Sequence, residues 1–173
     1  VAGTSLFIKW DGQLVLYVLV YVDDMLITGN NKSAISQLIT SLDSRFSLKD
    51  LGETKYFPGV EMTRSSSGLH LRQQKYISDL LEQTKMTAVK PVSTPMSLTP
   101  KLSLKSGTKL DNASEYRATI GNLQYMSFTR PDIAYAVNKL SQYMHYPTDL
   151  HWSAAKRILR YLAGTPSHGI LLR

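Results

Sequence analysis

Two adjacent carboxylates, Asp23 and Asp24, are the residues of this sequence most able to do chemistry. They end an apolar run, residues 14–22, beside which two ionised carboxylates require cations or hydrogen-bond donors. Mg²⁺ suits such oxygen ligands, and Mn²⁺ is an alternative. In a two-metal site the ions, ~3.5–4 Å apart, activate the attacking and leaving oxygens of a phosphoryl transfer. The pair therefore indicates metal-dependent catalysis, although Asp also favours turns and a plain hairpin turn is the alternative.

A predicted β-hairpin positions this pair. Residues 14–21 form a strand, 22–24 a tight turn and 25–28 the returning strand. An amphipathic helix follows, with Asn31 or Ser33 as its N-cap. Its predicted apolar face consists of Ile35, Leu38, Ile39, Leu42 and Phe46. Before the first strand, Trp10-Asp11-Gly12 is typical of a β-turn.

A second hairpin is predicted from residues 56–64 and 69–73, joined by a serine-rich turn. Pro58 falls inside its first strand, where proline deletes a ladder donor. We therefore expect leucine at this position to stabilise the fold. A short helix over residues 75–83 follows, with Tyr76, Leu80 and Leu81 directed inward.

The remainder of the chain is predicted to be helical after a linker. Residues 89–113 are rich in Pro, Ser, Thr, Lys and Gly, which favours a loop and a domain boundary. Helices are then predicted over 115–128, over 131–144 with Pro131 as first residue, and from an Asp149 cap to Gly164. A strand begins at 169–172. The predicted fold is α+β, with domains at 1–88 and 114–173 and a linker at 89–113.

Composition narrows the class of protein. Of 173 residues, 43% are hydrophobic and 19% charged, which fits a globular chain. No apolar run approaches the ~20 residues of a membrane span, and no secretory signal is present, so we expect an intracellular protein without a membrane partner. There is no cysteine, which excludes disulfides and thiolate metal sites. The first residue is Val1, which suggests a piece of a longer protein.

The charge is unevenly distributed. The net charge is +7, from 20 Lys and Arg against 13 Asp and Glu. Residues 1–62 hold five basic and seven acidic side chains, so the rest of the chain carries +9. A polyanionic partner is one interpretation, and solubility is the other.

These motifs together resemble the reverse transcriptases of copia-type retrotransposons. Tyr21-Val22-Asp23-Asp24, followed by Thr28-Gly29, resembles the family's catalytic hairpin. The stretches that continue the resemblance, in the family's order, are Lys49-Asp50-Leu51-Gly52, Lys55-Tyr56-Phe57-Pro58-Gly59-Val60-Glu61, Thr129-Arg130-Pro131-Asp132-Ile133-Ala134 and Lys156-Arg157-Ile158-Leu159-Arg160-Tyr161-Leu162. The resemblance covers nearly the whole chain.

The resemblance implies a right-hand polymerase that copies RNA into DNA with Mg²⁺. Asp23 would bridge the metals, Asp24 would be its partner, Tyr21 would lie near the primer terminus and Val22 against the template–primer. The hairpin at 55–73 would be the primer grip, and the helices after the linker would form a thumb-like unit. Its partners would be RNA template, DNA primer, deoxynucleotides and the rest of a polymerase and RNase H polyprotein.

Some residues depart from the family's pattern, and these departures lead to a second hypothesis about the function of the chain. The family's palm needs a third carboxylate on an earlier strand, and Asp11 is the only acid before residue 14. The fingers and RNase H are outside the matched stretches, and Pro58 stands where leucine is usual. The alternative is therefore an inactive relic that at most binds nucleic acid non-specifically. The flanking coding sequence would separate the two.

Three weaker signals complete the sequence analysis. Lys156, Arg157 and Arg160 lie on the polar side of the last helix, as phosphate contacts or as a solvated face. The four histidines, His70, His145, His151 and His168, lack metal-ligand spacing and are predicted to be surface or capping residues. The aromatics of the helical part are predicted to be core rather than base-stacking platforms. They are Tyr125, Phe128, Tyr135, Tyr143, Tyr146 and Trp152.

Overall fold

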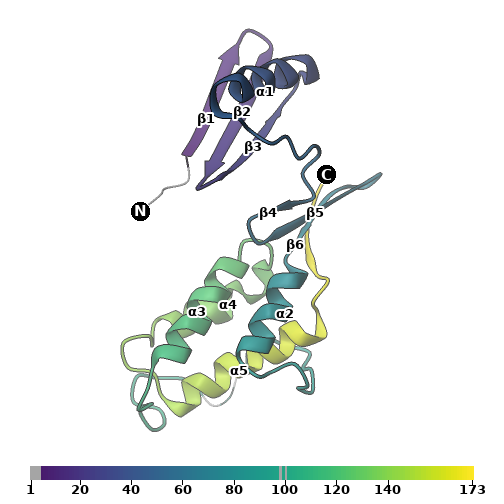
Figure 1. Cartoon of the computed structure of the whole chain (residues 1–173). Helices are drawn as coiled ribbons and strands as arrows, with labels where there is room; N and C mark the ends of the chain where they lie inside the picture. The colour runs from purple at the N-terminus through teal and green to yellow at the C-terminus, as the bar shows by residue number, and fades with distance from the viewer. Residues whose placement is uncertain (1–4, 98, 100) are drawn as a thin grey trace. The chain divides into compact units, whose positions relative to one another are not determined.

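The computed structural model describes residues 5–97, 99 and 101–173, and the chain forms two compact units, Val1–Phe57 and Pro58–Arg173 (Figure 1). Each unit combines antiparallel strands with helix, which confirms the predicted α+β class. No helix among these described residues is long and apolar enough to cross a membrane.

The first unit is a three-stranded sheet with one helix. Strands β1 (Ser5–Asp11), β2 (Leu14–Tyr21) and β3 (Asp24–Gly29) pair antiparallel in chain order, so β2 is central. Helix α1 (Lys32–Phe46) lies against this sheet (Figure 1), and the Asn31 side chain caps it by accepting from the Ala34 N–H at 3.1 Å. The predicted hairpin, helix and cap are confirmed.

Strand β1 is a feature that the sequence analysis did not predict. Every one of its seven residues is exposed, so no alternation of buried and exposed side chains marks it. Its backbone pairing with β2 makes it a strand. The turn expected at Trp10-Asp11-Gly12 lies one residue later, at Gly12 and Gln13, with a φ of +59° at Gly12.

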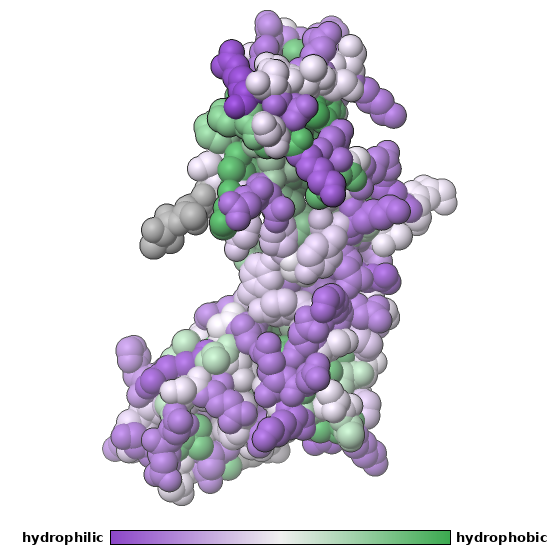
Figure 2. All heavy atoms as spheres, viewed as in Figure 1, coloured by the Kyte–Doolittle hydropathy of each residue, from purple (hydrophilic) through white to green (hydrophobic). Residues whose placement is uncertain are grey.

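The core of the first unit is thin. Leu16 is the only residue within 5–57 that is fully buried. The predicted apolar face of α1 is half-buried, except for Phe46, which is exposed. On the face seen in Figure 2, apolar side chains accordingly reach the surface of this unit beneath the helix.

A turn at Pro58–Gly59 corrects the predicted strand at 56–64. Strand β4 (Tyr56–Phe57) ends before the turn and β5 (Val60–Ser65) begins after it. Pro58 therefore interrupts no strand, and the prediction that it deletes a ladder donor within a strand is wrong. Proline fits here because its ring presets the φ that the first central position of a turn requires.

The second unit begins with a sheet in the order β5-β6-β7. Strand β6 (Gly68–Arg72) returns from β5 antiparallel, as predicted, and β7 (Gly169–Leu172) pairs with its other side. Residues nearly a hundred positions apart thus become neighbours, such as Leu71 and Ile170.

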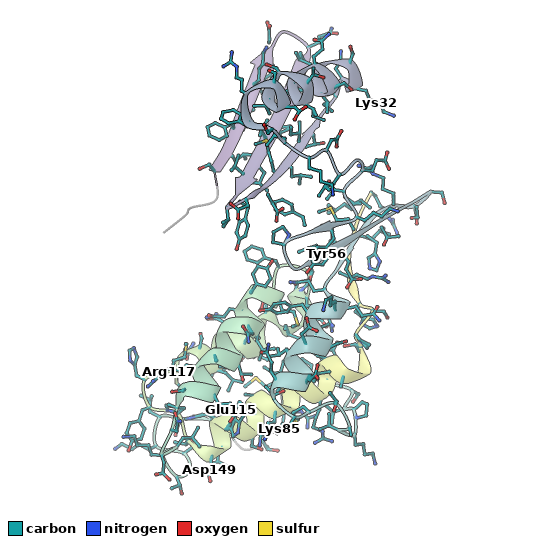
Figure 3. The ribbon with its side chains drawn as sticks, in the orientation of Figure 1. Lys32, Tyr56, Lys85, Glu115, Arg117 and Asp149 are labelled. Carbon is teal, nitrogen blue, oxygen red and sulfur yellow. The ribbon has the colours of Figure 1, made fainter. Side chains whose placement is uncertain are left out.

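Four helices form the body of the second unit: α2 (Gln74–Gln83), α3 (Ser114–Met126), α4 (Pro131–Ser141) and α5 (Asp149–Gly164). Their apolar faces meet in one core (Figure 3), with Ile77, Ile120, Leu123, Ile133, Leu140 and Leu159 among its buried residues. In α2, Ile77 is buried together with the predicted Leu80 and Leu81, whereas Tyr76 is only partly buried. Helix α4 begins at Pro131 as predicted but ends three residues early.

The compact units do not divide at residues 89–113. That segment has no helix or strand among its described residues, as predicted, but it packs on the helical core through Val89, Met96, Leu102 and Leu110. Helix α2, which precedes it, shares the same core as α3 to α5. The division therefore falls between Phe57 and Pro58, because a shared core joins elements on both sides of a proline-rich loop.

Candidate active site and nucleic-acid surface

The two predicted catalytic carboxylates lie at the tip of the β2–β3 hairpin. Tyr21, the last residue of β2, pairs with Asp24, the first residue of β3. Val22 and Asp23 form the two-residue turn between them. All four side chains are exposed, so the whole tetrapeptide is accessible.

The turn has an unusual backbone. Val22 has a φ of +51°, while the φ of Asp23 is not positive. This pattern of signs matches a type II′ turn, which prefers glycine at its first central position. A β-branched residue is costly in that region of φ, and such outliers concentrate at functional sites. The strained valine holds Asp23 at the tip of the hairpin.

The carboxylates suit a hard cation but do not complete a site. Asp23 and Asp24 offer the oxygen ligands that Mg²⁺ prefers. Within residues 5–97, 99 and 101–173, no three His, Cys, Asp or Glu side chains lie together as a metal-binding group. The pair therefore fits as part of a metal site that needs further ligands.

Tyr21 and Asp24 share one face of the hairpin. Residues directly opposite one another on antiparallel strands present their side chains to the same side of the sheet. Their register pairs the two residues at the strand ends. Asp23, in the turn, lies one residue beyond this pair.

The basic residues predicted on the last helix differ in their surroundings. Arg157 donates from Nη2 to Thr94 Oγ1 at 2.8 Å, and Arg160 donates from Nε to the Lys90 carbonyl at 2.8 Å. Both arginines therefore hold the segment 89–113 against α5. Lys156 is exposed, with its ammonium 5.2 Å from the centre of the Trp152 ring. These tethers join positions more than 60 residues apart, so no local pattern in the sequence indicates them.

The aromatic side chains divide into two groups. Tyr143 is buried and Trp152 is partly buried against the helical core, as predicted. Phe128 and Tyr135 are 79% and 76% exposed, and Tyr125 and Tyr146 are exposed as well. For these four the predicted core position is wrong, because they lie on helix ends and outer faces rather than on the apolar stripes.

An open pocket in the second unit was not predicted as a site. It has a volume of about 470 Å³, and its lining includes Arg130, Asp132, Tyr161, His70 and His168. Arg130 Nη2 and the Tyr161 hydroxyl both donate to Asp132 Oδ2, at 2.7 Å and 2.8 Å. Burial alone would raise the pKa of Asp132, but these hydrogen bonds outweigh burial, so its pKa is lowered. The charges of Arg130 and Asp132 neutralise one another. The hydrogen bond from Tyr161 to Asp132 connects the start of α4 to the end of α5.

His151 is a capping residue, as predicted, but a buried one. The N-cap of α5 is Thr148 rather than Asp149, and its backbone N–H donates to His151 Nδ1 at 3.0 Å in a capping box. Because Nδ1 accepts, Nε2 carries the proton and donates to the Ser103 carbonyl at 3.1 Å. The ring stacks on Tyr143 at a centroid distance of 4.0 Å.

Comparisons with known proteins identify a family and several relatives. Residues 2–98 match the family described as reverse transcriptase (RNA-dependent DNA polymerase). Over all 173 residues the chain is 57% and 55% identical to the retrovirus-related Pol polyproteins from transposons RE1 and RE2 of Arabidopsis thaliana. It spans 12% of the length of each polyprotein.

A shorter relative is also similar. Over 157 residues, the chain is 44% identical to an uncharacterized mitochondrial protein of Arabidopsis thaliana, an alignment that covers 91% of this chain and 65% of that protein. No solved structure matches the chain.

Proposed function

The chain belongs to the reverse transcriptase (RNA-dependent DNA polymerase) family, in its copia-type retrotransposon branch, and we propose that it supplies the catalytic hairpin of such an enzyme. The observation that carries the proposal is the exposed Asp23–Asp24 pair at the tip of a strained turn. Such a pair is accessible to a primer terminus and a nucleotide. The reaction would be RNA-directed DNA synthesis.

Asp23 and Asp24 would hold divalent metal, with Mg²⁺ as the natural ion and Mn²⁺ as a substitute. When bound, the metal ions would supply charge stabilisation to the attacking and leaving oxygens of nucleotidyl transfer. The carboxylates would fix the metals, Tyr21 would lie beside the primer end, and Val22 would contact the template–primer. The strained turn would keep these groups in one arrangement.

A third carboxylate would have to come from elsewhere in the polyprotein. Within the described part of the chain, β2 is paired on both sides, whereas β1 and β3 are edge strands, and of these two β3 carries Asp24. A strand added to the free edge of β3 would run beside Asp24, at the start of β3. We therefore place the missing carboxylate on a strand that pairs there.

The second unit would bind the nucleic acid. Pro58–Arg173 contains 15 Lys and Arg against seven Asp and Glu, a net charge of +8. Lys156, and the donors of Arg157 and Arg160 that do not hold the loop, would contact phosphates. The hairpin at 55–73 would act as primer grip, and α3 to α5 as a thumb-like unit. RNA template, DNA primer, deoxynucleotides and the remaining polyprotein, with its RNase H, would be the partners.

Primer extension by the full reverse transcriptase that carries this chain tests the proposal. Asp23→Asn should abolish nearly all extension of a primed RNA template, because it removes a charged metal ligand. Asp11→Asn is the matched control, an exposed aspartate of β1, and should extend normally. An Asp23→Asn rate within about tenfold of wild type, or about 1.4 kcal/mol, would show that Asp23 is not a ligand.

An inactive relic is the second candidate function. It is favoured by the lack of a group of three metal-binding side chains at the hairpin among the described residues. The 173-residue chain alone would then bind nucleic acid through phosphates, with a slope of about −0.9 in log K against log salt per contact. Extension by the isolated chain above that of its Asp23→Asn variant would contradict this candidate.

A further inference from the structure

The turn that opens the second unit has a defined type. The proline ring holds the φ of Pro58 near −65°, and Gly59 has a φ of +77°. Among the common β-turns, only type II combines a negative φ at its first central residue with a positive φ at its second. Residues 57–60 therefore form a type II turn.

Type I and type II turns differ in the peptide that joins the two central residues, which is turned over between them. The Pro58 carbonyl belongs to that peptide, and the Tyr125 hydroxyl of α3 donates a hydrogen bond to it. The carbonyl and the N–H of one trans peptide point in opposite directions. Tyr125 therefore fixes the direction of both polar groups at the tip of the turn.

The Tyr125 ring also lies directly on the backbone of Gly59. A Cβ at position 59 would lie 2.8 Å from the Tyr125 hydroxyl oxygen and 2.9 Å from its ring carbon Cε1. Both the φ and this close approach require glycine at 59. The Tyr125 ring therefore packs against the Gly59 backbone and leaves no room for a side chain at position 59.

Neighbouring side chains hold Tyr125 in place. Its ring centre is 5.3 Å from that of Tyr76 on α2 and 6.5 Å from that of Phe128. The Tyr76 hydroxyl in turn donates to Asn122 Oδ1 at 3.1 Å, one helical turn before Tyr125. Side chains from two helices of the second unit, α2 and α3, thus hold the turn in position.

This arrangement lies at the surface. Tyr125 is 37% exposed and Phe128 is 79% exposed. A hydrogen bond between exposed groups adds little to stability, because water offers the same bond in the unfolded chain. The consequence of this hydrogen bond is therefore the orientation of the turn rather than a gain in stability.

We propose that Tyr125 is a positioning residue for the primer–template, acting through the Pro58–Gly59 turn that it holds in the type II form. This inference rests on the proposed function, in which the hairpin at 55–73 contacts the primer. Loss of the hydroxyl frees the central peptide to turn over, which reverses the polar groups presented to the nucleic acid.

The test compares Tyr125→Phe with Tyr135→Phe in the reverse transcriptase that carries this chain. Each variant loses one exposed tyrosine hydroxyl and keeps its ring. Fluorescence anisotropy gives the Kd for a primer–template duplex, primer extension gives KM for the duplex and for deoxynucleotide, and calorimetry gives Tm. For Tyr125→Phe, Kd and the duplex KM should rise about threefold to tenfold. The deoxynucleotide KM and Tm should not change, and Tyr135→Phe should match wild type.

Two outcomes would overturn the inference. One is an unchanged Kd in Tyr125→Phe. The other is a Kd that changes only together with a Tm lowered by several degrees, which would make the role structural. The Asp23→Asn variant, measured in parallel, separates the role of Tyr125 from the proposed catalytic function. This variant should lose primer extension and keep the wild-type Kd for the duplex. If it extends like wild type, the catalytic proposal fails, while the Kd comparison still decides the role of Tyr125.

Discussion

Asp132 accepts two hydrogen bonds from Arg130, at 2.9 Å from Nε and 2.7 Å from Nη2, across the single residue Pro131 that begins α4. The arginine side chain is 1% exposed and the aspartate side chain 35%. The buried guanidinium thus forms an ion pair with a partly exposed carboxylate and also donates to Thr165, and Tyr161 orients the carboxylate with a third hydrogen bond.

Replacing Asp132 by Asn should destabilise the second unit by about 2–3 kcal/mol, because it leaves the Arg130 charge buried without its counterion. Urea unfolding measures the change. Asp79→Asn is the control: its ion pair with Lys75, at 3.1 Å, is exposed and should contribute less than about 0.5 kcal/mol. Equal effects from the two variants would show that burial of Arg130 does not matter.

The stability of the second unit should fall as the pH drops below about 6.5. Burial lowers the pKa of His151, partly opposed by its hydrogen bond to Ser103 and by Asp149. The folded chain therefore binds fewer protons than the unfolded chain between the lowered pKa and 6.5. The stability that the neutral His151 ring contributes is fully present above pH 6.5. It is lost as the pH falls toward the lowered pKa of His151 in the folded chain.

His151→Gln tests this by removing titration while keeping the acceptor that Thr148 needs in a capping box. Its Tm should vary less between pH 7 and pH 5 than that of wild type. The exposed His145→Gln should retain the wild-type dependence. If His151→Gln follows the wild-type curve, another group causes the pH dependence.

Lys85→Gly should stabilise the chain by about 0.5–1 kcal/mol. Lys85 follows α2 (Figure 3) with a φ of +56°, in a Schellman motif in which Met86 N donates to the Leu81 carbonyl at 2.7 Å. Glycine has no steric cost in that conformation. Ser78→Gly, in the middle of α2, should destabilise by a similar amount. Thermal or urea unfolding should show opposite signs for the two variants, and the same sign would contradict the motif.

Pro58→Leu should lower stability by about 0.4–1 kcal/mol, contrary to the expectation from the sequence, because the leucine chain has more unfolded conformations to lose. The first central position of a type II turn needs no ladder donor and prefers proline. A urea midpoint that rises in Pro58→Leu would show that burial gained by leucine outweighs the preset turn.

Local patterns in the sequence determined the hairpin that carries Asp23 and Asp24 and most of the helices. The apolar run 14–22 ending in two aspartates specified a strand and a turn, and β2 and β3 are where it placed them. Helices α1 and α4 follow from apolar residues spaced three and four apart, with Asn31 and Pro131 at their starts. These features depend on residues close in sequence, whose periodicity and capping chemistry are visible without a fold.

Tertiary structure alone decided which segments meet. Strand β1 exists through its pairing with β2 and has no buried residue to reveal it. Pro58 belongs to a turn held by Tyr125, 67 positions away, and Arg157 and Arg160 hold a loop more than 60 positions away. The sequence shows which side chains are apolar or polar and how they are spaced, but it does not show which partner each side chain contacts. Those partners depend on packing between distant segments, so the boundary at Phe57 and the tethers of α5 follow only from the fold.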